Sequence, residues 1–152
     1  MAAVAVKYPA FKELDAEILA VSIDPVATHK EWHEKELSHL VPGGVLFPML
    51  HDLDGKIGRL YNAYDEANGV HLRGHFLIDP DGIIQAMEIL AAPIGRDVTE
   101  ILRQLRALQH HRATGDVMPC GWEPGRPSLP MREGSRPAPG EVWKEWKPRN
   151  AF

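Results

Sequence analysis

The sequence predicts an α/β layered domain over residues 1–112 and an irregular C-terminal arm over residues 113–152. Three observations lead to this prediction. Helical and extended patterns alternate along the first segment. The run Asp79-Pro80-Asp81-Gly82 separates two apolar stretches and has the composition of a hairpin turn. Seven of the 13 prolines and three of the four tryptophans lie beyond Thr114, where periodicity ends.

The first two expected elements are a helix and a buried strand. Apolar residues recur at helical spacing near the start, at Val4, Tyr8, Phe11 and Leu14. Pro9 should kink or end this helix, because proline lacks the N–H that a helix interior requires. Residues 18–23 form a nearly continuous apolar run that Asp24-Pro25 closes. Such a run is typical of a strand buried on both faces of a parallel sheet.

Three shorter elements are expected next. Residues 28–36 are polar and rich in good helix formers, and a loop follows at residues 41–44. A brief strand is expected over residues 47–50. Another helical face then follows, formed by Ile57, Leu60, Tyr61 and Tyr64.

A hairpin and a long helix complete the domain. The hairpin joins residues 75–78 to residues 83–90, with proline second and glycine fourth in its turn. The helix is predicted over residues 97–111. Asp97 can cap it and Glu100 can complete a capping box. Its apolar stripe consists of Val98, Ile101, Leu102, Leu105 and Leu108.

Composition narrows the function classes. A formal charge of -4 and a pI near 6.0 give no reason to expect nucleic acid or an anionic membrane as partner. A single cysteine cannot form an internal disulfide, so a reducing compartment, most simply the cytoplasm, is expected. Residues 1–12 contain neither a basic n-region nor a long apolar run, so neither a signal peptide nor a membrane anchor is expected there.

The only cysteine, Cys120, lies in the arm rather than in the periodic core. Proline and glycine on either side of Cys120 exclude a helix or a central strand, so the thiol is expected to be accessible to a reaction partner. The tryptophans of the arm, Trp122, Trp143 and Trp146, indicate that it docks on a partner subunit or on its own core. A loosely ordered tail is the alternative.

Other candidate sites are explained more simply by structure. His29 and His33 have an i, i+4 spacing that can hold zinc, but no His-Glu-x-x-His motif is present, so neither a metal nor a cofactor is expected. His110 and His111 suit the end of a helix, where the dipole favours cations. Asp79 and Asp81 are turn residues, and Gly43-Gly44 lacks the lysine of a phosphate loop.

Several blocks, in order, resemble the 2-cysteine peroxiredoxins of the AhpC/TSA (alkyl hydroperoxide reductase C) type. They are residues 20–24 with Thr28-His29-Lys30-Glu31-Trp32-His33, Phe47-Pro48-Met49-Leu50-His51-Asp52, residues 73–85, Ile94-Gly95-Arg96-Asp97, and the arm through Trp122-Glu123-Pro124-Gly125. The resemblance covers residues 1 to about 130 and leaves residues 131–152 uncovered. It implies a thioredoxin-like fold and a thiol-dependent peroxidase that reduces hydrogen peroxide and alkyl hydroperoxides.

The resemblance also implies roles for particular residues. A peroxidatic cysteine in the family attacks the peroxide O–O bond and becomes a sulfenic acid. An arginine stabilises its thiolate and binds the peroxide, and Arg73 matches that arginine. Trp32 matches a family position near the active site and the dimer contact, and packing is an equal alternative for it. Implied partners are the hydroperoxide, thioredoxin or an AhpF-like flavoprotein reductase, and further copies of the chain in a homodimer or a ring of dimers.

The chain departs from the family in its resolving cysteine. The family sequence Val-Cys-Pro-Ala-x-Trp becomes Val117-Met118-Pro119-Cys120-Gly121-Trp122. Met118 therefore occupies the usual position of the resolving cysteine, and Cys120 is displaced from it by two residues. Since methionine cannot form a disulfide, Cys120 is the candidate resolving thiol.

The second departure concerns the peroxidatic residue. The family motif Phe-Val-Cys-Pro-Thr-Glu aligns so that its cysteine would fall four positions before Met1, and strands before it, including a central one, are also absent. Three explanations are open: a start misplaced after a UGA codon read as selenocysteine, an ordinary start error or fragment, and a genuinely short protein. The first two are favoured jointly, because the loss of a central strand would expose an apolar sheet edge.

Two functions from different classes follow. The first is a peroxidase in which Arg73 activates the catalytic chalcogen and Cys120 resolves it, with these 152 residues inactive alone. The second is a non-catalytic thioredoxin-like scaffold that binds redox partners through Cys120.

Overall fold

The computed structural model describes residues 1–131, 134, 137 and 140–151. The chain divides into two compact units, Met1–Val98 and Thr99–Phe152. We describe each unit by itself. The domain boundary predicted between residues 112 and 113 stays a prediction.

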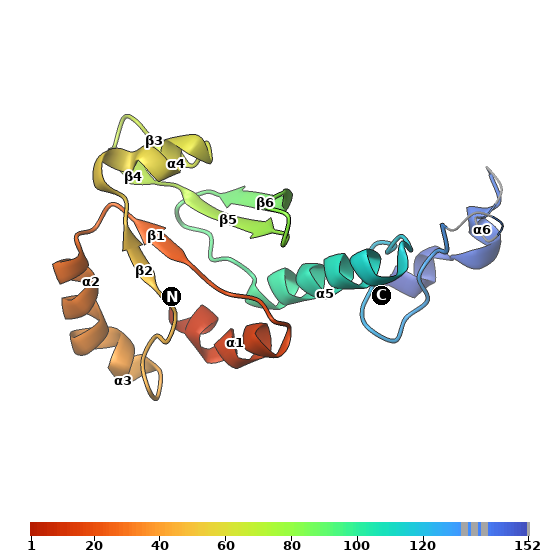
Figure 1. Ribbon diagram of the computed structural model, residues 1–152, viewed down its shortest axis with the longest axis horizontal. Coiled ribbons are helices and arrows are strands. Elements are labelled where there is room, and N and C mark those ends of the chain that lie inside the picture. Colours follow the sequence, from red (N-terminus) through yellow and green to blue (C-terminus); the bar gives the residue numbers. More distant parts are fainter. Residues whose placement is uncertain (132–133, 135–136, 138–139, 152) are drawn as a thin grey trace. The chain divides into compact units, whose positions relative to one another are not determined.

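The first unit holds the helices α1 (Ala2–Glu13), α2 (Val26–Trp32), α3 (Ser38–Leu40) and α4 (Lys56–Leu60), with a π-helical turn η1 (His33–Leu37) and a 3-10 turn η2 (Leu53–Gly55). Its strands are β1 (Ala20–Ser22), β2 (Met49–His51), β3 (Tyr64–Asp65), β4 (Val70–His71), β5 (Arg73–Ile78) and β6 (Ile84–Leu90). Figure 1 shows β1 beside β2, and β5 beside β6. The order of helices and strands matches the predicted α/β class.

The strands form three two-stranded sheets. β1 and β2 are parallel, with Val21 opposite Leu50. The pairs β3–β4 and β5–β6 are antiparallel. The strand expected over residues 18–23 is present, but its predicted burial on both faces is wrong: every residue of β1 is half-buried. The faces of this two-stranded β1–β2 sheet are only partly covered by the other described elements.

The sequence predicted that Pro9 would kink or end the first helix. Helix α1 does not end there but continues to Glu13. Its buried residues Ala5 and Phe11 lie on either side of the proline. Ala5 packs with Val41 and Phe47 in the core of the unit, and Tyr8 meets the Phe47 ring edge-on at a centroid distance of 5.4 Å. Packing on both sides of Pro9 therefore outweighs the one missing backbone hydrogen bond.

The prediction that Tyr64 continues a helical face is wrong. Helix α4 ends at Leu60, and Tyr64 lies in β3. Asn62 has a φ of 51°, and its left-handed backbone turns the chain out of the helix. The small β3–β4 hairpin follows, which the sequence patterns did not reveal.

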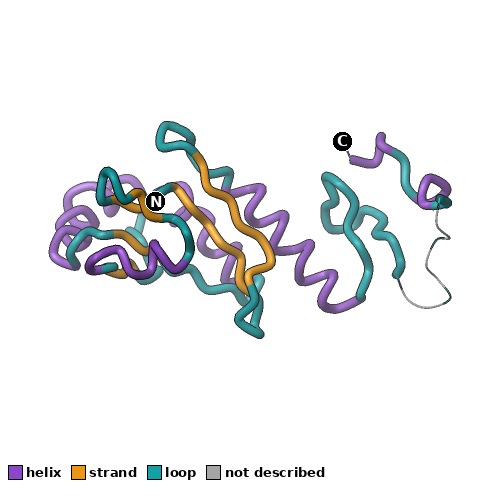
Figure 2. Tube along the Cα trace, turned by 90° about the horizontal axis from the view of Figure 1, so that it is seen from above, coloured by secondary structure: helices purple, strands orange, loops and turns teal. Residues whose placement is uncertain are grey.

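The hairpin between β5 and β6 is confirmed. The Asp79 carboxylate accepts hydrogen bonds from the backbone N–H groups of Asp81 and Ile83, both at 2.9 Å. Gly82 has a φ of 81°, which glycine adopts without strain. Figure 2 shows these two strands as the long orange pair. They place Arg73 and Leu90 opposite each other at the far end from the turn.

Among the described residues, the second unit holds α5 (Val98–Thr114) from Thr99 onward, the short helix α6 (Val142–Glu145) and a 3-10 turn η3 (Pro148–Ala151). The predicted helix over 97–111 is confirmed and extends three residues further. In its apolar stripe Val98, Ile101 and Leu102 are buried, and Leu105 and Leu108 are half-buried. No helix among the described residues is long and apolar enough to cross a membrane.

Candidate functional site

Arg73 begins β5 and is exposed. Its Nε donates a hydrogen bond to the carbonyl oxygen of Ala92, in the loop that follows β6. This bond ties the side chain to the loop after β6, and no hydrogen bond joins either terminal nitrogen of the guanidinium to a described residue. The residue predicted from the sequence as the peroxide-binding arginine is thus anchored and accessible.

Arg96 is a second cation of this site, which the sequence reasoning did not assign. It lies half-buried in the same loop, and its Nε is buried without a hydrogen-bond partner among the described residues. Burial lowers the pKa of the Arg96 guanidinium below its ordinary value, the nearby charge of Arg73 lowers it further, and Glu88 opposes both effects. Arg96 belongs to the block Ile94–Asp97 that resembles the family, and this resemblance could have identified it as a site residue.

His75 and Glu88 complete the group on the hairpin. They are directly paired across β5 and β6, with 3.5 Å between Nδ1 of His75 and Oε2 of Glu88. His75 shares a face of β5 with Arg73, because side chains two residues apart in a strand point to the same side. Burial lowers the pKa of His75, Glu88 acts in the opposite direction, and Arg96 adds to the lowering.

The beginning of α1 lies next to these arginines. Burial lowers the pKa of the Met1 α-amino group, and the charges of Arg96 and then Arg73 lower it further. Electrostatic repulsion of this kind requires that the three cations lie near one another. The start of α1, the start of β5 and the loop after β6 are therefore coupled through their charges. We call Arg73, Arg96, His75 and Glu88 the arginine cluster.

Cys120 lies in the second unit, on an exposed turn. The N–H of Trp122 donates to the carbonyl oxygen of Pro119 at 3.1 Å, and Gly121 between them has a φ of 65°. Met118, at the family's cysteine position, is half-buried. The sequence-based expectation of an accessible thiol agrees with this geometry, and its resolving role stays a prediction.

The turn that carries Cys120 is fixed to α5. Trp122 is 3% exposed, its ring lies 4.9 Å from the ring of His110, and its Nε1 donates to the carbonyl oxygen of Arg126. Arg103 donates from Nη1 to the carbonyl oxygen of Trp122 at 2.9 Å. Hydrogen bonding to Glu100 chiefly raises the pKa of Arg103, burial opposes this, and the neighbouring Glu123 and Cys120 add to the rise. Trp122 therefore packs against α5 of its own chain. Of the two docking sites expected for the arm, a partner subunit and its own core, this contact agrees with the second.

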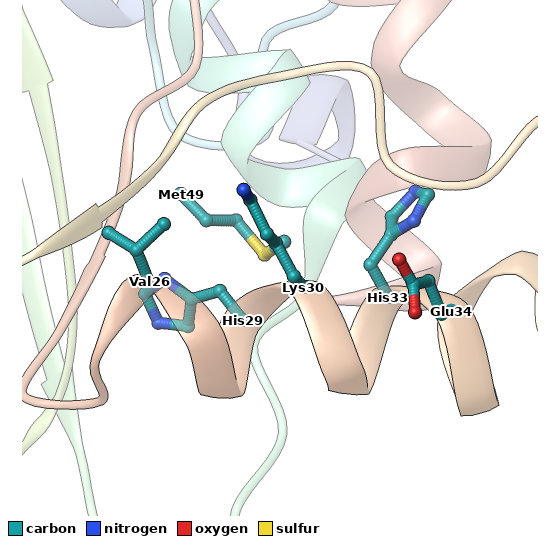
Figure 3. A pocket seen from close by; sticks show the side chains of 6 residues that line it. All are labelled: Val26, His29, Lys30, His33, Glu34 and Met49. Atoms are coloured by element: carbon teal, nitrogen blue, oxygen red, sulfur yellow. The ribbon is translucent and has the colours of Figure 1, made fainter.

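A separate pocket of about 200 Å³ lies over α2 and η1 (Figure 3). Val26, His29, Lys30, His33 and Glu34 contribute to it from the helix, and Met49 from β2. Nε2 of His29 lies 2.8 Å from Oγ of Ser22, and Nε2 of His33 accepts from the N–H of Val45. Within the described part of the chain, no group of three or more His, Cys, Asp or Glu side chains could hold a metal ion.

Trp32, the other residue carried over from the resemblance, is half-buried at the end of α2. Its Nε1 donates to Oε2 of Glu36 at 3.0 Å. The predicted place of Trp32 near an active site and a dimer contact stays a prediction.

Comparison with known proteins identifies the family. Residues 1–87 match the AhpC/TSA family, and residues 107–133 match the C-terminal domain of 1-Cys peroxiredoxin. PrxU of Peptoclostridium acidaminophilum, described as a selenocysteine-containing peroxiredoxin, is 50% identical over 157 residues, which cover all of this chain and 74% of PrxU. Alkyl hydroperoxide reductase C of Bacillus subtilis is 39% identical over 81% of this chain and 65% of its own length.

Solved structures agree. The reduced 2-Cys peroxiredoxin of Plasmodium vivax has a TM-score of 0.78 and 36% identity, over 84% of this chain and 66% of that protein. AhpC of Enterococcus faecalis has a TM-score of 0.71 and 34% identity, over 78% of this chain and 70% of that protein. The predicted resemblance and the thioredoxin-like fold class are confirmed. This chain belongs to the AhpC/TSA family of peroxiredoxins, the oxidoreductases that act as peroxidases.

Proposed function

We propose that the chain supplies the peroxide-binding and resolving parts of a thiol- or selenol-dependent peroxidase that reduces hydrogen peroxide and alkyl hydroperoxides. Arg73 binds the peroxide oxygens and stabilises the anionic nucleophile, and Cys120 resolves the oxidised nucleophile. The nucleophile itself is not among the 152 residues, because the single cysteine of the sequence is Cys120.

The observation that supports this proposal most directly is the place of the α1 start. Burial lowers the pKa of the Met1 α-amino group, and the charges of Arg96 and then Arg73 lower it further. A residue that precedes α1 would therefore be delivered to the two guanidiniums. A helix N-terminus and a fixed cation both lower the pKa of a thiol or selenol. The 50% identity to a selenocysteine-containing peroxiredoxin supports selenium or sulfur at that position.

The proposed chemistry has three steps. The thiolate or selenolate attacks one peroxide oxygen, the O–O bond breaks, and the other oxygen leaves as an alkoxide or hydroxide that takes up a proton. The arginines stabilise the negative charge on that leaving oxygen. The thiol of Cys120 then condenses with the sulfenic or selenenic acid and releases water. A dithiol reductant, thioredoxin or an AhpF-like flavoprotein, restores both groups by exchange.

We propose a homodimer or a ring of dimers as the assembly. β6 pairs only with β5 among the described residues, so its outer edge is open. Met87 and Ile89 on this strand are exposed. An open edge of seven residues is suited to antiparallel pairing with a second copy about a two-fold axis. The cytoplasmic location expected from the single cysteine stays a prediction.

A peroxide-consumption assay with thioredoxin and thioredoxin reductase tests the function. We expect no turnover from the 152-residue chain and turnover from a version extended with a strand and a Phe-Val-Cys-Pro-Thr-Glu segment before Met1. In that extended version, Arg73→Ala should lower kcat/KM by at least about 100-fold, since removal of a single charge-stabilising donor has this cost. Arg149→Ala, an exposed arginine of η3 outside the cluster, is the matched control. Turnover by the 152-residue chain would show that the nucleophile lies within it.

The non-catalytic scaffold is kept as a second candidate because the exposed Cys120 is the only thiol of the chain. Intact mass of the natural protein separates the two. A species heavier by several dozen residues, or one with a selenium isotope pattern, supports the peroxidase. A mass near 17.0 kDa supports the scaffold.

A further inference from the structure

The arginine cluster contains more positive than negative charge, and Glu88 is its carboxylate. Arg73 and Arg96 contribute two positive charges, and the Glu88 carboxylate opposes the lowering of the Arg96 pKa. The same carboxylate also faces His75 on the neighbouring strand, at 3.5 Å. Glu88 is thus coupled to two basic groups, to His75 by direct contact and to Arg96 through its charge.

We propose that His75 is a positioning residue for the anion site of the cluster: it draws the Glu88 carboxylate away from Arg96, and so sets how much positive charge Arg73 and Arg96 present to a bound oxyanion. The proposal rests on the proposed function of Arg73 and deepens it.

The backbone supports this arrangement. His75 and Glu88 are directly opposite in the β5–β6 ladder, so the strand register keeps them in contact. The Nδ1 of His75 and the Nε of Arg96 are both buried and lack a hydrogen bond among the described residues. A buried donor without a partner is costly, so a ligand or a small movement of Glu88 that satisfies it is favoured.

The direction of the effect follows from charge. While His75 is neutral, the cluster carries the two arginine charges and the Glu88 charge, a net charge of about +1. When His75 gains a proton, it pairs with Glu88 and the net charge rises to about +2. An oxyanion at the guanidiniums should therefore bind more tightly as the pH falls. Since burial lowers the pKa of His75, this gain occurs on the acidic side of the ordinary histidine range.

Glu88 and Arg96 act directly on the charge of His75, Arg73 acts on Arg96, and both arginines act on the Met1 α-amino group, so these groups must be considered together. Glu88 lies on β6, Arg96 in the loop after β6, Arg73 on the same strand as His75, and the Met1 α-amino group at the start of α1. The α-amino group also gains charge as the pH falls. The test therefore compares the pH dependence of anion binding between variants and the unmodified chain, because the profile of one protein alone would not separate the two groups.

Binding of inorganic sulfate to the 152-residue chain, measured by calorimetry at pH 7.5 and pH 5.5, tests the proposal. In the unmodified chain sulfate should bind more tightly at pH 5.5 than at pH 7.5. In His75→Asn this increase in affinity should be smaller by about threefold to tenfold, because one charge at this distance contributes about that much. Glu88→Gln should tighten sulfate binding at pH 7.5 by a similar factor. His39→Asn, an exposed histidine of α3, should leave the profile unchanged.

The outcomes separate this proposal from the function it rests on. If His75→Asn and the unmodified chain have the same profile while Arg73→Ala abolishes binding, the role of His75 is wrong and the anion site stands. If Arg73→Ala binds sulfate as well as the unmodified chain does, or if the unmodified chain binds none, both are wrong. Should His75→Asn fail to fold, NMR of the unmodified chain decides: sulfate should raise the titration midpoint of the His75 ring by about 0.5–1 pH unit, and an unchanged midpoint overturns the proposal.

Discussion

Asp52 shows how one buried side chain connects three parts of the first unit. It is 2% exposed, and its carboxylate accepts hydrogen bonds from the N–H groups of Ile57 and Gly58 at the start of α4. It also binds Nε2 of His71 at 2.8 Å, while Nδ1 of His71 lies 3.3 Å from the carbonyl oxygen of Val21 in β1. A helix start, a hairpin and a strand are therefore held by one carboxylate.

We predict that Asp52→Asn lowers the free energy of unfolding by about 2–4 kcal/mol, because an amide cannot accept from all three donors and leaves buried N–H groups unpaired. Denaturant unfolding at pH 7 measures this. Asp54→Asn is the matched control, since Asp54 is exposed and its φ of 63° suits asparagine. A loss below 0.5 kcal/mol for Asp52→Asn would contradict the prediction.

The same carboxylate predicts a pH dependence. Burial favours the neutral form of Asp52, but the bonds from Ile57, Gly58 and His71 outweigh it, so its pKa lies below the ordinary 3.8. A lowered folded-state pKa means that the stabilisation is complete above 3.8 and disappears as the pH falls through the folded value. The difference in stability between the unmodified chain and Asp52→Asn should therefore shrink below pH 3.8. A difference that stays constant down to pH 2 would contradict this.

Two elements are held by tertiary contacts against their local preferences. Helix α1 contains Pro9 and has buried residues on both sides of it. The loop that carries Cys120 has little secondary structure, with one antiparallel bridge between Val117 and Leu129. Its order depends on contacts with α5, above all those of Trp122 and Arg103.

For α1 we predict that Pro9→Ala raises the free energy of unfolding by about 1–3 kcal/mol. Alanine restores the N–H that can bond to the carbonyl oxygen of Ala5, and removes the ring that crowds that carbonyl. Denaturant unfolding and far-ultraviolet circular dichroism measure the gain. Ala10→Gly, one position on in the same helix, should instead lose about 1 kcal/mol. A destabilised Pro9→Ala would show that the proline geometry is required for packing.

For the loop we predict that Trp122→Ala lowers the stability of the second unit by about 3–5 kcal/mol, the usual cost of emptying a buried tryptophan site. Trp122→Phe retains most of the ring but loses the bond to the Arg126 carbonyl, so about 1–2 kcal/mol is expected. Hydrogen exchange of residues 117–129 reports the loss directly. Equal protection in Trp122→Ala and the unmodified chain would contradict the docking role.

At the scale of the whole molecule, the exposed edge of β6 bears on whether two copies of the chain pair with each other. Met87 is 68% exposed on β6, whereas ordinary monomers shield apolar side chains on strand edges. The solved relatives are peroxiredoxins and AhpC proteins of the same fold.

We predict that Met87→Lys with Ile89→Lys weakens the proposed dimer at least about tenfold, because pairing of two β6 strands would bring like charges together. Light scattering coupled to size-exclusion chromatography measures the dissociation. Leu60→Lys is the control, since Leu60 is 84% exposed and belongs to α4 rather than to β6. A dimer unaffected by the β6 changes would place the interface elsewhere.

The sequence by itself determined the α/β class, the β5–β6 hairpin, the long helix α5 and the family, because turn chemistry, helical periodicity and ordered motif blocks are local properties of the chain. It also singled out Arg73 and Cys120. Only the tertiary structure decided the burial of β1, the course of α1 through Pro9 and the place of Tyr64 in a strand, because packing partners distant in sequence set these outcomes. The grouping of Arg96, His75 and Glu88 around Arg73 likewise depends on strand register and on a returning loop, which no local pattern records.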